Sequence, residues 1–200
     1  MTTENATATT ETAVVHYRLV PEQSNFTVQA FAEGLFSAFG HDPILNIKDF
    51  TGDVQFVPGS FESASVKITI PADSIVVSSN LKGAKEKDRL DIEQTMREQV
   101  LEIAKYPEIL FVSSNVSVTR LAEARYRARV IGDLTFHGAT QKNLWITSEV
   151  TFSGESLRAT GEFSLKQTDF GIKPFSVAGG TIKLKNELKF SFDIAAEKQG

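Results

Sequence analysis

The sequence predicts an all-β fold, either a closed antiparallel barrel or a two-sheet sandwich, with one inserted α-helix. Three features support this prediction: apolar and polar residues alternate along eight segments, the turns between these segments are short, and one other segment repeats apolar residues at helical spacing. Parallel strands that are buried on both faces read as continuous apolar runs. Because the alternating segments keep one polar face, we expect them to pair antiparallel.

The predicted strands follow one another from residue 26 onward, each with its apolar side chains on one parity. Several exceed the five or six residues of a common strand. Pro58-Gly59 and Gly154 indicate tight turns between neighbouring strands. Residues 44–48 offer an additional strand for pairing. The eight strands are expected at 26–32, 50–56, 64–70, 110–118, 126–136, 144–152, 157–165 and 182–194.

A helix is predicted within residues 81–103, where Ile92, Met96 and Val100 recur every four residues. Tyr106-Pro107 ends it, because a residue before proline disfavours the helical region. In an all-β chain such a helix either plugs one end of the core or acts as a moving lid over it. We favour the plug.

The domain organisation is expected to be simple: a disordered tail at 1–13 and one barrel domain at 14–198. The first residues are polar and rich in threonine, and they lack the apolar stretch of a secretory signal. A cytoplasmic location is therefore expected.

Composition excludes several classes of function. The chain of 200 residues has no cysteine, which excludes disulfides and thiolate metal sites. Its net charge of −4 argues against nucleic-acid binding, because phosphate contacts need an excess of lysine and arginine. No apolar run reaches the length of a transmembrane segment.

Two of the three histidines, His41 and His137, are the candidates for chemistry. A two-histidine, one-carboxylate metal site with Asp42 or Asp169 is chemically feasible, but the spacings match no metal-binding motif. We therefore interpret both histidines as residues that fix turns. The chain also lacks a Gly-x-Ser-x-Gly elbow and a phosphate-binding loop. We expect no catalytic residue, no metal and no cofactor.

Arg125, Arg127 and Arg129 share the outward parity of one predicted strand. Such a row suits either an anionic membrane surface or a solvated face with acidic neighbours, and we favour the solvated face.

The fifteen phenylalanines are open to two interpretations. They fill a barrel completely as an ordinary core, or they line a cavity for an apolar ligand. Strands of about ten residues rise roughly 33 Å, a length that suits an extended acyl or prenyl tail. The residues expected to line such a lumen are Phe26, Val28, Phe56, Val66, Ile68, Val130, Leu134, Ile146, Phe163, Leu184, Leu188 and Phe190.

Five motifs in order along residues 15–196 resemble the YceI-like family of polyisoprenoid-binding proteins. The segments that carry the resemblance are 17–28 (Ser24-Asn25-Phe26-Thr27-Val28), 50–54 (Phe50-Thr51-Gly52), 106–111 (Tyr106-Pro107), 132–138 (His137-Gly138) and 167–172 (Asp169-Phe170-Gly171-Ile172). The resemblance implies an eight-stranded antiparallel, lipocalin-like barrel whose long apolar lumen holds a polyisoprenoid or similar long-chain amphiphile.

On this basis we expect a protein that binds, sequesters or transports a long-chain apolar lipid, with polar contacts at the lumen mouth from His41, His137 and Asp169. Two alternatives stay open: an enzyme or metal-dependent protein acting at a His41/His137 mouth, and a packed interaction module without a cavity. A homodimer also stays open, because an unpaired strand edge would favour pairing whereas a closed barrel removes such edges.

Overall fold

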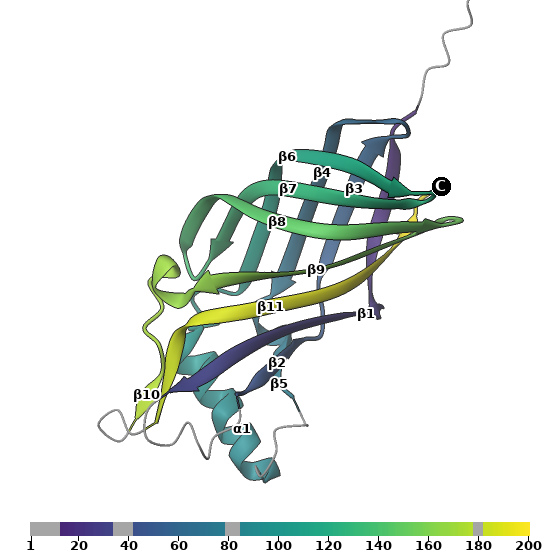
Figure 1. Ribbon diagram of the computed structural model, residues 1–200. Coiled ribbons are helices and arrows are strands. Elements are labelled where there is room, and N and C mark those ends of the chain that lie inside the picture. The colour runs from purple at the N-terminus through teal and green to yellow at the C-terminus, as the bar shows by residue number, and fades with distance from the viewer. Residues whose placement is uncertain (1–12, 34–41, 79–84, 178–181) are drawn as a thin grey trace, which may run out of the picture.

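Eight long antiparallel strands form a closed barrel in the computed structural model, which describes residues 13–33, 42–78, 85–177 and 182–200 (Figure 1). In order around the barrel, β1, β3, β4, β6, β7, β8, β9 and β11 each pair with the next, and β11 pairs back to β1. Their bounds are β1 Val15–Glu33, β3 Thr51–Val57, β4 Ser60–Pro71, β6 Glu108–Ala122, β7 Arg125–Phe136, β8 Ala139–Ser153, β9 Ser156–Lys166 and β11 Ile182–Lys198. The predicted barrel with one helix is confirmed.

Three short strands complete the wall. The first half of β1 pairs with β3, and its second half pairs with β2 (Ile44–Ile47) through Thr27–Gln29. β2 in turn pairs with β5 (Ile75–Val77), and β10 (Ser176–Val177) pairs with the start of β11. The pairing considered at 44–48 is therefore present, as a link between β1 and β5.

Alternation along the strands separates the two faces of the wall. In β7 the side chains of Ala128, Val130, Leu134 and Phe136 are buried, whereas the three arginines on the other parity, Arg125, Arg127 and Arg129, are exposed. A strand points successive side chains to opposite faces, so the apolar parity lines the interior of the barrel.

Ion pairs connect neighbouring strands on the outer face. Arg158 Nη2 lies 2.9 Å from Asp193 Oδ2, and Lys189 Nζ lies 2.9 Å from Glu162 Oε2. The hydrogen bond from Lys189 lowers the pKa of the Glu162 carboxyl. Exposed pairs of this kind contribute little to stability, so the barrel depends mainly on its ladders and its apolar interior.

The helical segment lies at one end of the barrel (Figure 1). It consists of α1 (Glu86–Thr95) followed directly by a π-helical turn, η2 (Met96–Val100). Met96 is buried as predicted, but Ile92 and Leu90 are 42% and 51% exposed. The apolar stripe is therefore only partly covered, and its second half makes the contact with the barrel. None of the described helices is long and apolar enough to cross a membrane.

A buried carboxylate attaches the helical segment to β5. Glu93 is 9% exposed; its Oε2 accepts a hydrogen bond from the Val77 backbone N–H at 3.1 Å, and its Oε1 lies 3.0 Å from Arg97 Nη2. The same Arg97 nitrogen donates to the Asp73 carbonyl at 3.1 Å. Glu93 and Arg97 thus join the helical segment to the backbone of Val77 and of Asp73.

Replacing Glu93 with alanine should loosen this end of the barrel without opening the wall. The change leaves the Val77 N–H without its acceptor and Arg97 without its carboxylate partner, which we expect to cost about 1–3 kcal/mol. Amide hydrogen exchange should then lose protection across 86–100, with the β7 and β8 amides unchanged. Glu98→Ala, an exposed change five residues further along the same helical segment, is the matched control. Equal loss of protection in β7 would contradict the assignment of Glu93 as a local anchor.

Candidate functional site

The barrel encloses a cavity of about 450 Å³, lined by side chains from all eight long strands. All twelve residues of the predicted lumen set line it. The cavity also accounts for inward side chains that are only half-buried, such as Ile146, Phe163 and Leu188, because their free surface faces the empty lumen. The barrel is therefore hollow, unlike the packed module considered as an alternative.

Aromatic rings pack together at the end of the lumen opposite the helix. The Tyr17 and Phe56 rings stack with centroids 5.8 Å apart, and Phe152 meets Phe56 edge-on at 5.7 Å. Phe61 and Tyr126 extend the group, with centroids 5.8 Å apart. We call these five residues the aromatic cluster. Such contacts stabilise by more than the buried area alone.

The mouth of the lumen lies at the helical segment. Asp91 and Ile92 from α1, and Met96, Val100 and Leu101 at its continuation, line the cavity. Asp91 and Ile92 are also exposed to solvent, so the cavity reaches the surface at this end. The helical segment therefore covers the mouth only in part.

The lining is almost entirely apolar. Its polar members within the described ranges are Asp91, Thr95, Tyr126, Ser148 and Gln167. Gln167 Nε2 donates to the Lys185 carbonyl at 2.8 Å. Asp91 is the charged member of this described lining, which contains no lysine, arginine or histidine. The lumen thus has nothing to neutralise an anion along the described wall.

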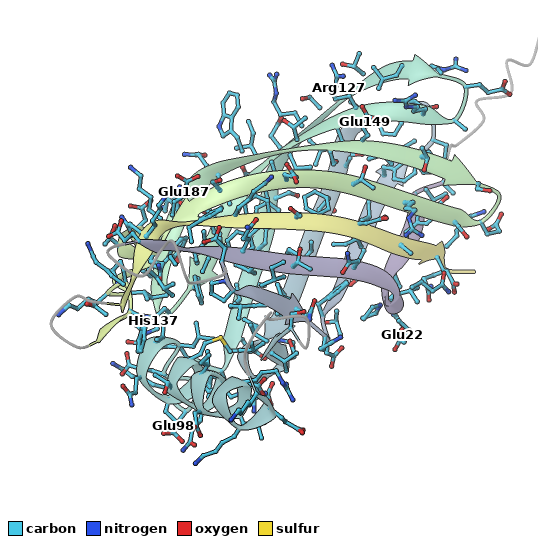
Figure 2. The ribbon with its side chains drawn as sticks, turned by 60° about the horizontal axis from the view of Figure 1, so that its bottom comes forward. Glu22, Glu98, Arg127, His137, Glu149 and Glu187 are labelled. Carbon is cyan, nitrogen blue, oxygen red and sulfur yellow. The ribbon has the colours of Figure 1, made fainter. Side chains whose placement is uncertain are left out.

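His137 lies at the mouth end of the barrel, outside the lining (Figure 2). It occupies the β7–β8 turn in a left-handed backbone conformation, φ 50°. Its Nδ1 lies 3.3 Å from the Phe170 carbonyl, which can only accept, so Nδ1 carries the proton. Its Nε2 lies 2.9 Å from Glu102 Oε2 without hydrogen-bond geometry, and its ring packs 4.3 Å from Tyr106.

His137 therefore joins the β7–β8 turn, the segment after η2 and the turn η3 (Gln167–Phe170). Gly138 is part of the same junction, because a Cβ there would lie 2.5 Å from the Tyr106 ring. The geometry matches the interpretation of His137 as a residue that fixes turns.

The other two predicted mouth contacts are not brought to the lumen. Asp169 is exposed on η3 and does not line the cavity. His41 lies outside the described residues. Across the described ranges, no three histidine or acidic side chains are placed to hold a metal ion.

The arginine row lies on the outer face of β7, with Arg127 and Glu149 toward the end away from the helix (Figure 2). Arg125 pairs with Glu149 at 2.8 Å. The Arg129 guanidinium lies over the Trp145 ring, 5.4 Å from its centroid, and Trp145 is 59% exposed. The row thus has one acidic partner and one aromatic partner.

Comparison with protein families gives one match along almost the whole barrel. The model of the YceI-like domain matches residues 17–196. Curated relatives include a UPF0312 protein of Pseudomonas putida strain GB-1, 30% identical over 164 residues, covering 78% of this chain and 77% of that protein. Another is a UPF0312 protein of Pseudomonas savastanoi pv. phaseolicola, 29% identical over 153 residues, covering 72% and 71%.

Solved structures share the fold at low sequence identity. BcnA of Burkholderia cenocepacia superposes with a TM-score of 0.65 at 18% identity, covering 88% of this chain and 98% of BcnA. A polyisoprenoid binding domain from Saccharophagus degradans superposes with a TM-score of 0.64 at 13% identity, covering 92% and 98%.

Substituting His137 with alanine should destabilise the barrel. The change removes the hydrogen bond to Phe170 and the ring contact with Tyr106, at an expected cost of about 1–3 kcal/mol. Urea unfolding followed by far-UV circular dichroism measures it. Asp169→Ala, an exposed change two residues from the lumen-lining Gln167, should shift the free energy of unfolding by about 0.5 kcal/mol or less. A His137→Ala protein as stable as wild type would contradict the turn-fixing role.

Proposed function

The chain belongs to the YceI-like family, and from this premise we propose that it binds one long-chain apolar lipid in the barrel lumen and thereby sequesters or transports it. The lipid is a polyisoprenoid or a similar amphiphile. One observation carries the proposal: a continuous apolar cavity of about 450 Å³ that reaches the surface at the helical segment and ends at the aromatic cluster. That shape suits one extended chain.

Burial of hydrocarbon would supply the affinity. Each CH₂ group transferred from water into such a lumen contributes about 0.8 kcal/mol, close to a fourfold change in Kd. Affinity should therefore rise with chain length until the chain reaches the aromatic cluster. This type of binding is non-directional, so lumen length and width would select the ligand.

The charge of the lining indicates that the part of the lipid buried in the lumen is uncharged. Asp91 is its charged residue within the described ranges, and it lies at the mouth. A carboxylate or phosphate inside the lumen would lose its hydration without gaining a cationic partner from that wall. A neutral head group that donates hydrogen bonds fits the mouth better.

The solved neighbour from Saccharophagus degradans, described as a polyisoprenoid binding domain, supports the lipid class. The alternative of an enzyme or metal-dependent protein at a His41/His137 mouth has weaker support. Of these two histidines the described one, His137, lies outside the lining, and Phe170, Tyr106 and Glu102 surround its ring. We therefore infer a binding protein rather than an enzyme.

Purified protein should release a long-chain apolar lipid on extraction with organic solvent. Mass spectrometry of the extract measures it, and protein unloaded by extraction and refolded should take up prenyl alcohols from micelles. An empty extract together with no uptake of any prenyl alcohol would contradict the proposal.

Ala128→Phe should shorten the usable lumen. Ala128 is buried on the lumen parity of β7, three residues from its start next to the aromatic cluster, so a phenyl ring there would occupy the deep end. In a series of n-alkanols, wild-type affinity should rise about fourfold per CH₂ and then level off.

The variant should level off at a shorter chain, and alkanols below that length should bind as they do to wild type. Thr147→Phe places the same ring on the exposed face of β8 and is the matched control. If Ala128→Phe folds and its affinities level off at the wild-type chain length, the chain does not reach the aromatic cluster.

A further inference from the structure

One polar side chain is buried in the deep half of the lumen without a partner. Ser148 lies on β8, is 7% exposed and lines the cavity. Its hydroxyl makes no hydrogen bond to any described residue, yet its Oγ keeps some accessible surface. The oxygen therefore keeps access to the open lumen.

The wall around Ser148 supplies no polar group in register with it. Its cross-strand partners are Ala128 on β7 and Gly161 on β9. The ring of Phe192 covers Gly161, where a Cβ would lie 2.6 Å from Phe192 Cζ. Ile146 and Val150, the neighbours of Ser148 on the same face of β8, are aliphatic. Ser148 is thus a hydroxyl on an apolar surface.

Such a placement is unfavourable in the empty barrel. Ser148 is 7% exposed, so its hydroxyl keeps only part of its hydration and gains no protein partner in return, which costs free energy. An ordered water normally needs two to four polar partners, and neither the cross-strand partners nor the same-face neighbours of Ser148 on β8 add a polar side chain to its own hydroxyl. Alanine would fit the same position without this cost. The unsatisfied hydroxyl is therefore best explained by a partner that comes with the ligand.

We propose that Ser148 is a specificity-determining residue whose hydroxyl donates a hydrogen bond to an oxygen atom of the bound lipid. The ligand is then a long apolar chain with a hydroxyl, carbonyl or ether oxygen in the deep half of the lumen. This inference rests on the proposed function and refines its ligand class. Ser148 lies five residues before the end of β8 at Ser153, on the aromatic-cluster side of the barrel. The oxygen either enters first or belongs to a chain with oxygens at both ends.

Three probes of equal chain length test the proposal: hexadecane, 1-hexadecanol and 1,16-hexadecanediol. Their affinities are measured by displacement of a fluorescent apolar dye from wild type and from Ser148→Ala. In wild type, at least one of the oxygen-bearing probes should bind more tightly than hexadecane. In Ser148→Ala that preference should fall roughly threefold to tenfold, the range of one hydrogen bond. The affinity of hexadecane should be equal or higher.

The losses of affinity of 1-hexadecanol and of the diol in Ser148→Ala distinguish a ligand whose oxygen-bearing end enters first from a ligand with oxygens at both ends. A loss for both 1-hexadecanol and the diol shows that the oxygen-bearing end enters first. A loss for the diol alone shows a ligand with oxygens at both ends. If the preference is the same in Ser148→Ala as in wild type, or if hexadecane loses affinity as strongly as the other two probes, the proposal is overturned.

Two variants control for structural effects. Thr147→Ala removes the neighbouring hydroxyl on the exposed face of β8 and should change none of the affinities. Ala128→Ser combined with Ser148→Ala moves the hydroxyl to the facing position on β7 and should restore part of the preference. Hexadecane binding by wild type reports on the proposed function separately. If wild type binds none of the three probes, both the proposed function and this inference fail.

Discussion

Closure of the sheet is the constraint on which the rest of the structure depends. β1 and β11, the first and last strands, pair from Tyr17↔Lys198 to Glu33↔Lys183, with two register shifts along the way. Without this ladder the wall would leave two long unpaired edges and an apolar face open to water. With it, one parity of every strand faces a single enclosed space. Both the lumen and the continuous wall around its sides follow from this pairing of residues far apart in the sequence.

A closed barrel of eight strands is just wide enough to be filled by its own side chains or to hold one slim ligand. In this protein the two ends of the barrel differ in structure. Five aromatic rings pack together at one end, whereas a helical segment anchored by Glu93 covers the other only in part. His137 reinforces the mouth end by joining three turns around it. The interior that results is apolar along nearly its whole length, with Ser148 as its buried exception on β8.

Regular alternation made the wall predictable from the sequence. Strands such as β7 and β9 have an unbroken parity, so the twelve lumen residues could be selected by counting alone. β1 is different: its register shifts between Val20 and Asn25, and Pro21 lies within that break. Tyr17 precedes the break, so it lies outside the strand that the alternation predicts at 26–32. The sequence does not single out Ser148, for a related reason. A lone serine on an apolar parity carries no pattern, and its missing hydrogen bond is visible only when the cross-strand neighbours Ala128 and Gly161 are in place.

The position of Trp145 determines whether intrinsic fluorescence can report a lipid that enters the lumen. It is the one tryptophan of the chain, and its indole lies exposed on the outer face under the Arg129 guanidinium. The barrel wall separates it from the lumen, so its emission spectrum should stay nearly constant while a lipid fills the interior. An intrinsic-fluorescence titration would then score a fully loaded protein as inactive. The rings that line the lumen are phenylalanines and Tyr126, which makes Phe→Trp replacement on the lumen parity the route to a direct optical sensor.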